Sequence, residues 1–81
     1  MKSRTDLLIL SILNKEGIDC IAKAITAKEL PIEDLGVKLN TIQKRLRVLT
    51  SLGYIALGYR DFQANTYFIT ELGKMTLEES K

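Results

Sequence analysis

The sequence predicts a small α+β domain, mainly helical, in which three helical segments precede a two-stranded β-hairpin and a short final helix. Three observations predict it. The 81 residues suffice for one hydrophobic core, so we expect residues 1–81 to form one domain. The composition, 46% hydrophobic and 27% charged with one proline, is that of an ordinary globular protein. Helical periodicity dominates up to Gly53, and two alternating, strand-like runs follow it.

The composition also excludes several functions. The chain has no histidine and one cysteine, Cys20, so a disulfide, most metal sites and Ser-His or Cys-His catalysis are excluded. We therefore expect no enzyme activity, no metal and no cofactor. The longest apolar stretch, Leu7 to Leu13, is far shorter than the roughly 20 residues of a membrane span. We expect a cytoplasmic protein without a membrane partner, with Cys20 as a small core or interface residue.

The net charge of +2 conceals an asymmetry along the chain. Residues 35–60 carry five of the 12 basic residues and none of the ten acidic ones. These five are Lys38, Lys44, Arg45, Arg47 and Arg60. Segregated positive charge of this kind indicates an anionic partner.

Two helical segments are expected before residue 35. Ser3 is a plausible N-cap for a first helix, which runs to Glu16 and ends at Gly17. Its apolar residues surround nearly the whole axis, which indicates a second burying surface such as a partner subunit. Asp19 can cap a second helix from Cys20 to Ile25, but its end is open. Either Thr26 and Glu29 form a capping box for a separate short helix, or Pro31 begins a turn over residues 32–35.

The third helix has the clearest pattern. Asn40 and Gln43 have capping-box spacing, so we expect the helix to begin at Asn40, run to about Leu52 and end at Gly53. At 3.6 residues per turn, one arc is apolar and consists of Leu39, Ile42, Leu46, Leu49 and Leu52. The opposite face has two cations and no acid, and consists of Asn40, Gln43, Lys44, Arg47 and Ser51. Arg45 falls beside the apolar arc, with its stem along the core edge.

A hairpin and a last helix complete the chain. The strands are expected at residues 54–59 and 66–70, joined by a turn from Arg60 to Asn65. Tyr59 is expected to pack on the hairpin. Thr70 then caps a helix from Glu71 to about Glu79, with Leu72 and Met75 facing inward.

Two motifs carry a resemblance to a known superfamily. The segment NTIQKRLRVLTSLGYI, from Asn40 to Ile55, resembles the recognition helix of winged helix-turn-helix proteins as it enters the first wing strand. The segment YFITELGK, from Tyr67 to Lys74, is similar to the end of the wing in MarR, ArsR and PadR regulators. The long connection from Ala27 to Lys38 is closest to PadR-like proteins, whereas ArsR-type metal sensing lacks the necessary ligands here.

This resemblance implies binding to double-stranded DNA. The third helix would enter the major groove, and the hairpin would lie along the flanking backbone as a wing. The residues implied to face DNA are Lys38, Thr41, Gln43, Lys44, Arg47 and Ser51, with Arg60, Gln63 and Asn65 from the wing. Gln43 suits adenine and Arg47 suits guanine, whereas Lys38, Lys44 and Arg60 suit phosphates.

We therefore expect a sequence-specific transcriptional regulator, a repressor, that forms a homodimer through its first and last helices. Two alternatives stay open at this point. Winged helices also serve as protein-interaction modules, and a DNA-binding accessory protein of replication or recombination would present the same surface.

Overall fold

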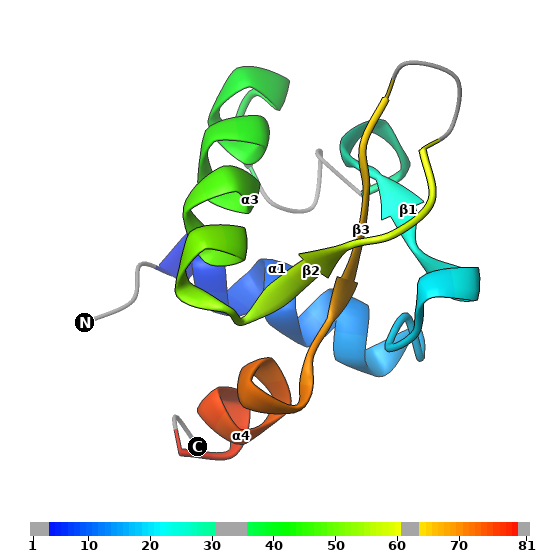
Figure 1. The fold of residues 1–81 in the computed structure, drawn as a ribbon. Helices are drawn as coiled ribbons and strands as arrows, with labels where there is room; N and C mark the ends of the chain where they lie inside the picture. Colours follow the sequence, from blue (N-terminus) through cyan, green and yellow to red (C-terminus); the bar gives the residue numbers. More distant parts are fainter. Residues whose placement is uncertain (1–3, 31–35, 61–63, 80–81) are drawn as a thin grey trace.

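An antiparallel three-stranded sheet joins distant parts of the chain and lies against the helices (Figure 1). The computed structural model describes residues 4–30, 36–60 and 64–79. In chain order the elements are α1 (Arg4–Lys15), η1 (Ile21–Lys23), β1 (Ile25–Thr26), η2 (Ala27–Glu29), α3 (Leu39–Leu52), β2 (Ile55–Leu57), β3 (Thr66–Ile69) and α4 (Glu71–Glu79), where η marks a 3-10 turn. The predicted mainly helical α+β class is confirmed.

Strand β3 is the centre of the sheet, which has the order β1-β3-β2. The predicted hairpin is present, with Ile55 opposite Ile69 and Leu57 opposite Tyr67. On the other edge, Ile25 and Thr26 pair with Tyr67 and Thr66. This third strand was not predicted, because two residues are too few to show an alternating pattern.

The segment after α1 differs from the predicted second helix. Residues from Cys20 to Ile25 form the turn η1 and then enter β1, and Ile21 is 44% exposed. So short a helix has little stability by itself, whereas pairing with β3 satisfies the backbone groups of β1. The capping box of Thr26 and Glu29 is confirmed, because the Thr26 N–H and hydroxyl donate to Glu29 Oε1 at 3.5 and 3.2 Å. The alternative turn at residues 32–35 lies outside the described residues.

Helix α3 ends where predicted but begins earlier. Gly53 has a φ of 85°, the left-handed conformation that favours glycine at a helix end. At the other end Lys38 is the N-cap, and Asn40 already lies within the helix, so the predicted Asn40–Gln43 capping box is wrong. Leu39 packs against the core, and this contact extends the helix past the local capping signal.

Helix α4 is capped as predicted but is rotated. The Gly73 N–H donates to Thr70 Oγ1 at 3.2 Å, which confirms the cap. Leu72 and Met75 are 46% and 57% exposed, so their predicted inward orientation is wrong. The buried positions are instead Gly73 and Thr76. Gly73 packs so closely that a Cβ there would collide with the backbone carbonyl of Tyr54.

A buried ion pair links α1 to α3 at the edge of the core. The Asp6 carboxylate accepts hydrogen bonds from Arg45 Nε at 2.7 Å and from Nη2 at 2.5 Å, and Asp6 is only 1% exposed. The bond to Asp6 raises the pKa of Arg45 further above its usual value. The core beside it consists mainly of Ile9, Leu10, Leu13, Ile42, Leu46, Leu49, Ile55 and Ile69. Arg45 therefore lies beside the core, as its position on the helix predicted.

Substitutions of this ion pair should have unequal effects. Arg45→Ala removes the guanidinium from a buried carboxylate, so we expect it to lower the free energy of unfolding by about 3 kcal/mol. Asp6→Asn should cost less, because the Arg45 side chain is 29% exposed and can turn toward water. Urea denaturation measures both variants. A loss below about 1 kcal/mol for Arg45→Ala would place the pair among weak surface ion pairs and contradict this prediction.

Thr70 and Asn40, which were both predicted to cap a helix, provide a matched test. Thr70→Ala removes an observed cap and should lower the free energy of unfolding by about 1 kcal/mol. Asn40→Ala should change it by less than about 0.5 kcal/mol, as for an ordinary exposed helix position. Thermal and urea denaturation compare the two. Equal losses would mean that Asn40 does cap α3.

Candidate nucleic-acid interface

The outward face of α3 is polar, exposed and free of acidic residues. The buried residues Ile42, Leu46 and Leu49 hold the opposite face of the helix against the core. The exposed polar residues are Lys38 at the N-cap and Asn40, Thr41, Gln43, Lys44, Arg47 and Ser51 within the helix. All six predicted site residues on or next to this helix therefore lie at the surface.

Asn40 is an addition to the predicted site. Its role as a cap would have occupied the side chain, but the structure places it in the first turn as an exposed residue. The amide is therefore available to an external partner. The signal that could have found it is Leu39, which already belongs to the apolar arc and so to the helix.

The hairpin brings further polar groups near α3. Arg60 and Asn65 are exposed where the hairpin strands lead into its turn, whereas Gln63 lies outside the described residues. Asn65 and Gln43 line one hollow of about 240 Å³, so the hairpin and the first half of α3 meet at the surface. Tyr59 is 69% exposed, which contradicts its predicted packing on the hairpin.

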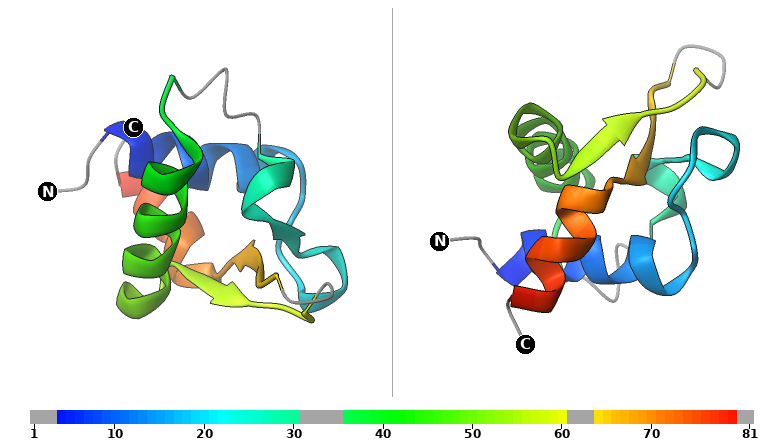
Figure 2. Two further views of the ribbon diagram at one scale, coloured as in Figure 1. Left: turned by 90° about the horizontal axis from the view of Figure 1, so that it is seen from above. Right: turned by 60° about the horizontal axis from the view of Figure 1, so that its bottom comes forward.

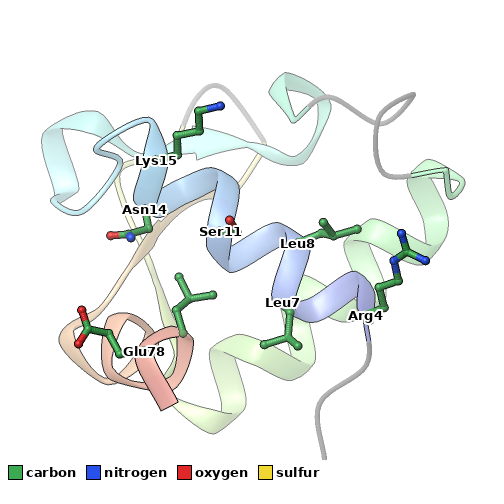
Figure 3. A pocket seen from close by; sticks show the side chains of 8 residues that line it. Arg4, Leu7, Leu8, Ser11, Asn14, Lys15 and Glu78 are labelled. Atoms are coloured by element: carbon green, nitrogen blue, oxygen red, sulfur yellow. The ribbon is translucent and has the colours of Figure 1, made fainter. Parts of the chain in front are cut away.

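A second hollow lies between α1 and α4, away from this face. Figure 2 shows α4 lying across α1, and Figure 3 shows side chains from both helices around the hollow. Its volume is about 550 Å³, and Leu7, Leu8 and Leu77 supply apolar lining. Leu7 and Leu8 are only partly buried, as expected from the excess of apolar residues on the first helix. Charged groups, Arg4, Lys15 and Glu78, also line it.

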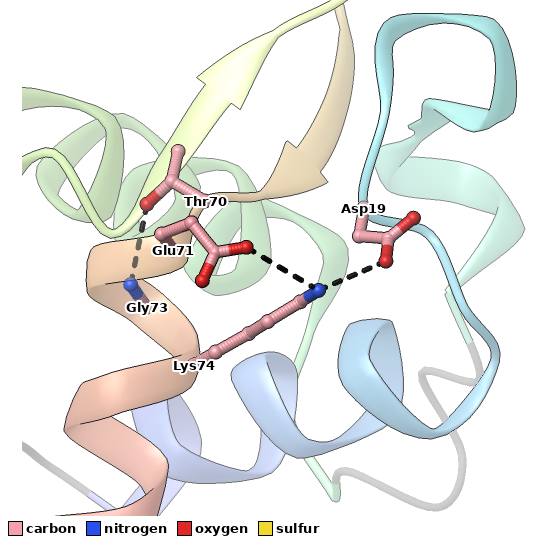
Figure 4. A network of polar contacts seen from close by, with 5 residues as sticks. All are labelled: Asp19, Thr70, Glu71, Gly73 and Lys74. Carbon is pink, nitrogen blue, oxygen red and sulfur yellow. Dashed lines mark hydrogen bonds and ion pairs between the residues drawn. The ribbon is translucent and has the colours of Figure 1, made fainter.

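Lys74 links α4 to the segment that follows α1 (Figure 4). Its Nζ lies 2.9 Å from Asp19 Oδ2, which follows α1, and 3.8 Å from a carboxylate oxygen of Glu71. The hydrogen bond and the charge of Lys74 lower the pKa of Asp19, and the same contact raises the pKa of Lys74. These groups are exposed, so the pair orients α4 more than it stabilises the domain.

Two cations of α3, Lys44 and Arg47, form no ion pair with a carboxylate of the described residues. Within residues 4–30, 36–60 and 64–79, the ion pairs use Arg45 and Lys74, and none uses Lys44 or Arg47. Arg45 is directed to Asp6, so the cations that α3 presents to solvent are Lys44 and Arg47. Such a surface attracts polyanions.

Three further predictions concern a metal site, a membrane span and the cysteine in the described part of the chain. No group of three or more His, Cys, Asp or Glu residues there could hold a metal ion. No described helix combines the length and apolar character that crossing a bilayer requires. Cys20 is exposed, so the core alternative of its prediction is wrong, and its place at an interface stays a prediction.

Comparisons with known proteins identify the fold. No protein-family model and no curated protein matches the chain. TubR from Bacillus megaterium pBM400 is similar in structure, with a TM-score of 0.82 and 19% identity over 98% of this chain and 86% of TubR. The adhesin competence repressor AdcR from Streptococcus pyogenes has a TM-score of 0.74 and 20% identity over 96% of this chain. The chain spans 53% of AdcR, about half its length. Both neighbours are winged-helix structures, and this chain has the same winged helix-turn-helix fold.

Proposed function

We propose that this chain is a DNA-binding regulator that inserts α3 into the major groove of duplex DNA. The observation that carries the proposal is the exposed face of α3, which has several amide and hydroxyl groups, no carboxylate, and two cations that pair with no described carboxylate. A solvated helix face ordinarily mixes both signs of charge. The major groove is wide enough for a helix, and its base edges offer hydrogen-bond partners for such side chains.

Each predicted residue has a role that its chemistry suits. Gln43 would read adenine and Arg47 guanine through paired hydrogen bonds, because each presents two donors or a donor and an acceptor in one plane. Phosphates would be contacted by Lys38, Lys44 and Arg60. Further polar contacts would come from Asn40, Thr41, Ser51, Asn65 and, as predicted from the sequence, Gln63.

Repression of transcription is the form of regulation that one neighbour favours, because AdcR is named a repressor. A replication or recombination accessory protein would use the same DNA-binding face. Selection of bound duplexes from a random pool separates a regulator with a defined operator from a protein that binds without sequence preference.

The hollow between α1 and α4 supports a homodimer. Its apolar side chains, Leu7, Leu8 and Leu77, are exposed in part although they belong to helices that also contribute to the core. A second copy of the chain would cover them and would place two α3 helices on one duplex. Two half-sites separated by about one helical turn are the usual consequence of such symmetry.

A protein-interaction module is the second candidate, and a specific observation favours it. Leu52, Leu72 and Met75 are 46–57% exposed, and a Cβ at Gly53 would lie 3.5 Å from the Leu72 side chain. These side chains therefore expose apolar surface near the C-terminal end of α3. This candidate gives no reason for the absence of acidic residues along the helix, so DNA binding is preferred.

Duplex DNA binding should depend steeply on salt. Fluorescence anisotropy of a labelled duplex selected from a random pool measures affinity as salt rises. Each lost phosphate contact should reduce the slope of log affinity against log salt by about 0.9, so Lys44→Ala should give a shallower slope. Arg47→Ala should lower affinity for the selected duplex by about tenfold and reduce discrimination between sequences. Absent or salt-independent binding by the unaltered chain would refute the proposal.

Dimerisation should depend on Leu7. This residue lines the hollow between α1 and α4 but does not pack against the core cluster. Leu7→Glu should therefore shift the chain toward monomer in sedimentation velocity, with its helical circular dichroism retained. Leu57→Glu, at a 49% exposed apolar position outside this hollow, is the control and should leave the dimer intact. Monomer alone at high micromolar concentration of the unaltered chain would refute the homodimer.

A further inference from the structure

We propose that the hollow between η2, α3 and β3 is a binding site for a backbone phosphate of duplex DNA, with Lys28 as its cationic residue. This inference rests on the proposed function and adds a contact that neither the sequence motifs nor the third helix indicate. The hollow has a volume of about 240 Å³, and Lys28, Gln43, Asn65 and Tyr67 are among its lining residues. These residues come from three elements far apart in the chain.

The charge of the hollow favours an anion. Among the described residues of its lining, Lys28 is the charged one, and the other polar side chains are amides and hydroxyls. Lys28 is exposed, and no hydrogen bond or ion pair of the described residues uses its side chain. Its ammonium is therefore free to contact an external phosphate.

The neighbouring acid, Glu29, does not line this hollow, although its carboxylate lies 3.2 Å from the hydroxyl of Thr26, which does. Its carboxylate accepts the capping-box hydrogen bonds from the Thr26 N–H and hydroxyl. Glu29 also lines a different hollow, together with Ile12 and Ile18. The capping box therefore engages the Glu29 carboxylate in its own hydrogen bonds, whereas Lys28 lines the hollow together with Gln43.

The volume and the position of the hollow favour a phosphate that belongs to a polymer. Sites for small molecules usually have volumes of about 300–1,000 Å³ and bury most of the ligand. This hollow is smaller, and it adjoins the polar face of α3 through Gln43 and the wing through Asn65. A strand whose bases meet α3 would bring a phosphate to this position, where contacts fix register on the duplex.

The two sides of the hollow are also held at a fixed distance. Thr26, next to η2, pairs with Thr66, next to Asn65 at the base of the wing. The backbone of β1 thus fastens the turn that carries Lys28 to the wing. A phosphate bound here would contact a preformed site, which lowers the entropy lost on binding.

The test uses two lysines in matching positions. Lys23 and Lys28 are both exposed and lie in three-residue 3-10 turns on either side of β1, but Lys23 does not line the hollow. Lys28→Ala should reduce the salt slope by about 0.9 and weaken binding to selected and scrambled duplexes by the same factor. Lys23→Ala should leave both unchanged, and Lys28→Arg should restore most of the slope. Thermal denaturation checks that the three variants are folded.

The outcomes separate this inference from the proposed function. If the unaltered chain and Lys44→Ala behave as predicted but Lys28→Ala binds like the unaltered chain, the phosphate site is refuted and DNA binding stands. Equal losses for Lys23→Ala and Lys28→Ala would show diffuse charge attraction and also refute the site. Inorganic phosphate, compared with chloride at equal ionic strength, should not displace the duplex. Displacement that depends on Lys28 would make this a site for free phosphate and overturn the proposal, and absence of duplex binding would overturn both.

Discussion

The ion pair between Asp6 and Arg45 determines how α3 faces its surroundings. The helix has basic side chains at three positions within one turn, Lys44, Arg45 and Arg47, and the buried carboxylate of Asp6 accepts only one of them. Separating a buried carboxylate from its guanidinium is unfavourable, so rotations of α3 that release Arg45 are disfavoured. Because a helix is rigid, fixing Arg45 also directs Lys44 and Arg47 outward. Burial of the apolar arc requires the same rotation, so two independent forces agree on it.

Strand β3 fixes the position of the wing, as the ion pair fixes the rotation of α3. It pairs with β2 as a hairpin and with β1 across a sequence separation of about 40 residues, and the Ile69 N–H donates to the Ile18 carbonyl at 2.9 Å. The wing is therefore attached to the segment that carries η2 and to the end of α1. The candidate interface depends on these bonds. Its parts, α3, η2 and the wing, are far apart in the sequence, so non-covalent contacts must bring them together.

Features set by local chemistry could be predicted from the sequence, and features set by tertiary contacts could not. Gly53 ends a helix because of its own backbone conformation, and Thr70 begins one through its own hydroxyl. The start of α3 depends instead on packing of Leu39, and β1 exists because of a partner strand. The exposure of Lys44 and the other polar residues of α3 followed from periodicity. Asn40 was misjudged, because its capping signal is real locally but competes with the core.

The small number of cations near α3 gives the candidate interface a reason to need the apolar hollow between α1 and α4. A single copy offers few cations on or beside α3, and affinity from phosphate contacts grows with their number. One copy would therefore bind a half-site weakly at physiological salt. In the proposed homodimer, a second copy would double the phosphate contacts and make binding of the second half-site intramolecular, which would raise the overall affinity without a new contact on either half-site. A domain with so few cations needs an apolar surface elsewhere if it is to hold one site on DNA, and the hollow between α1 and α4 provides such a surface on a different part of the molecule.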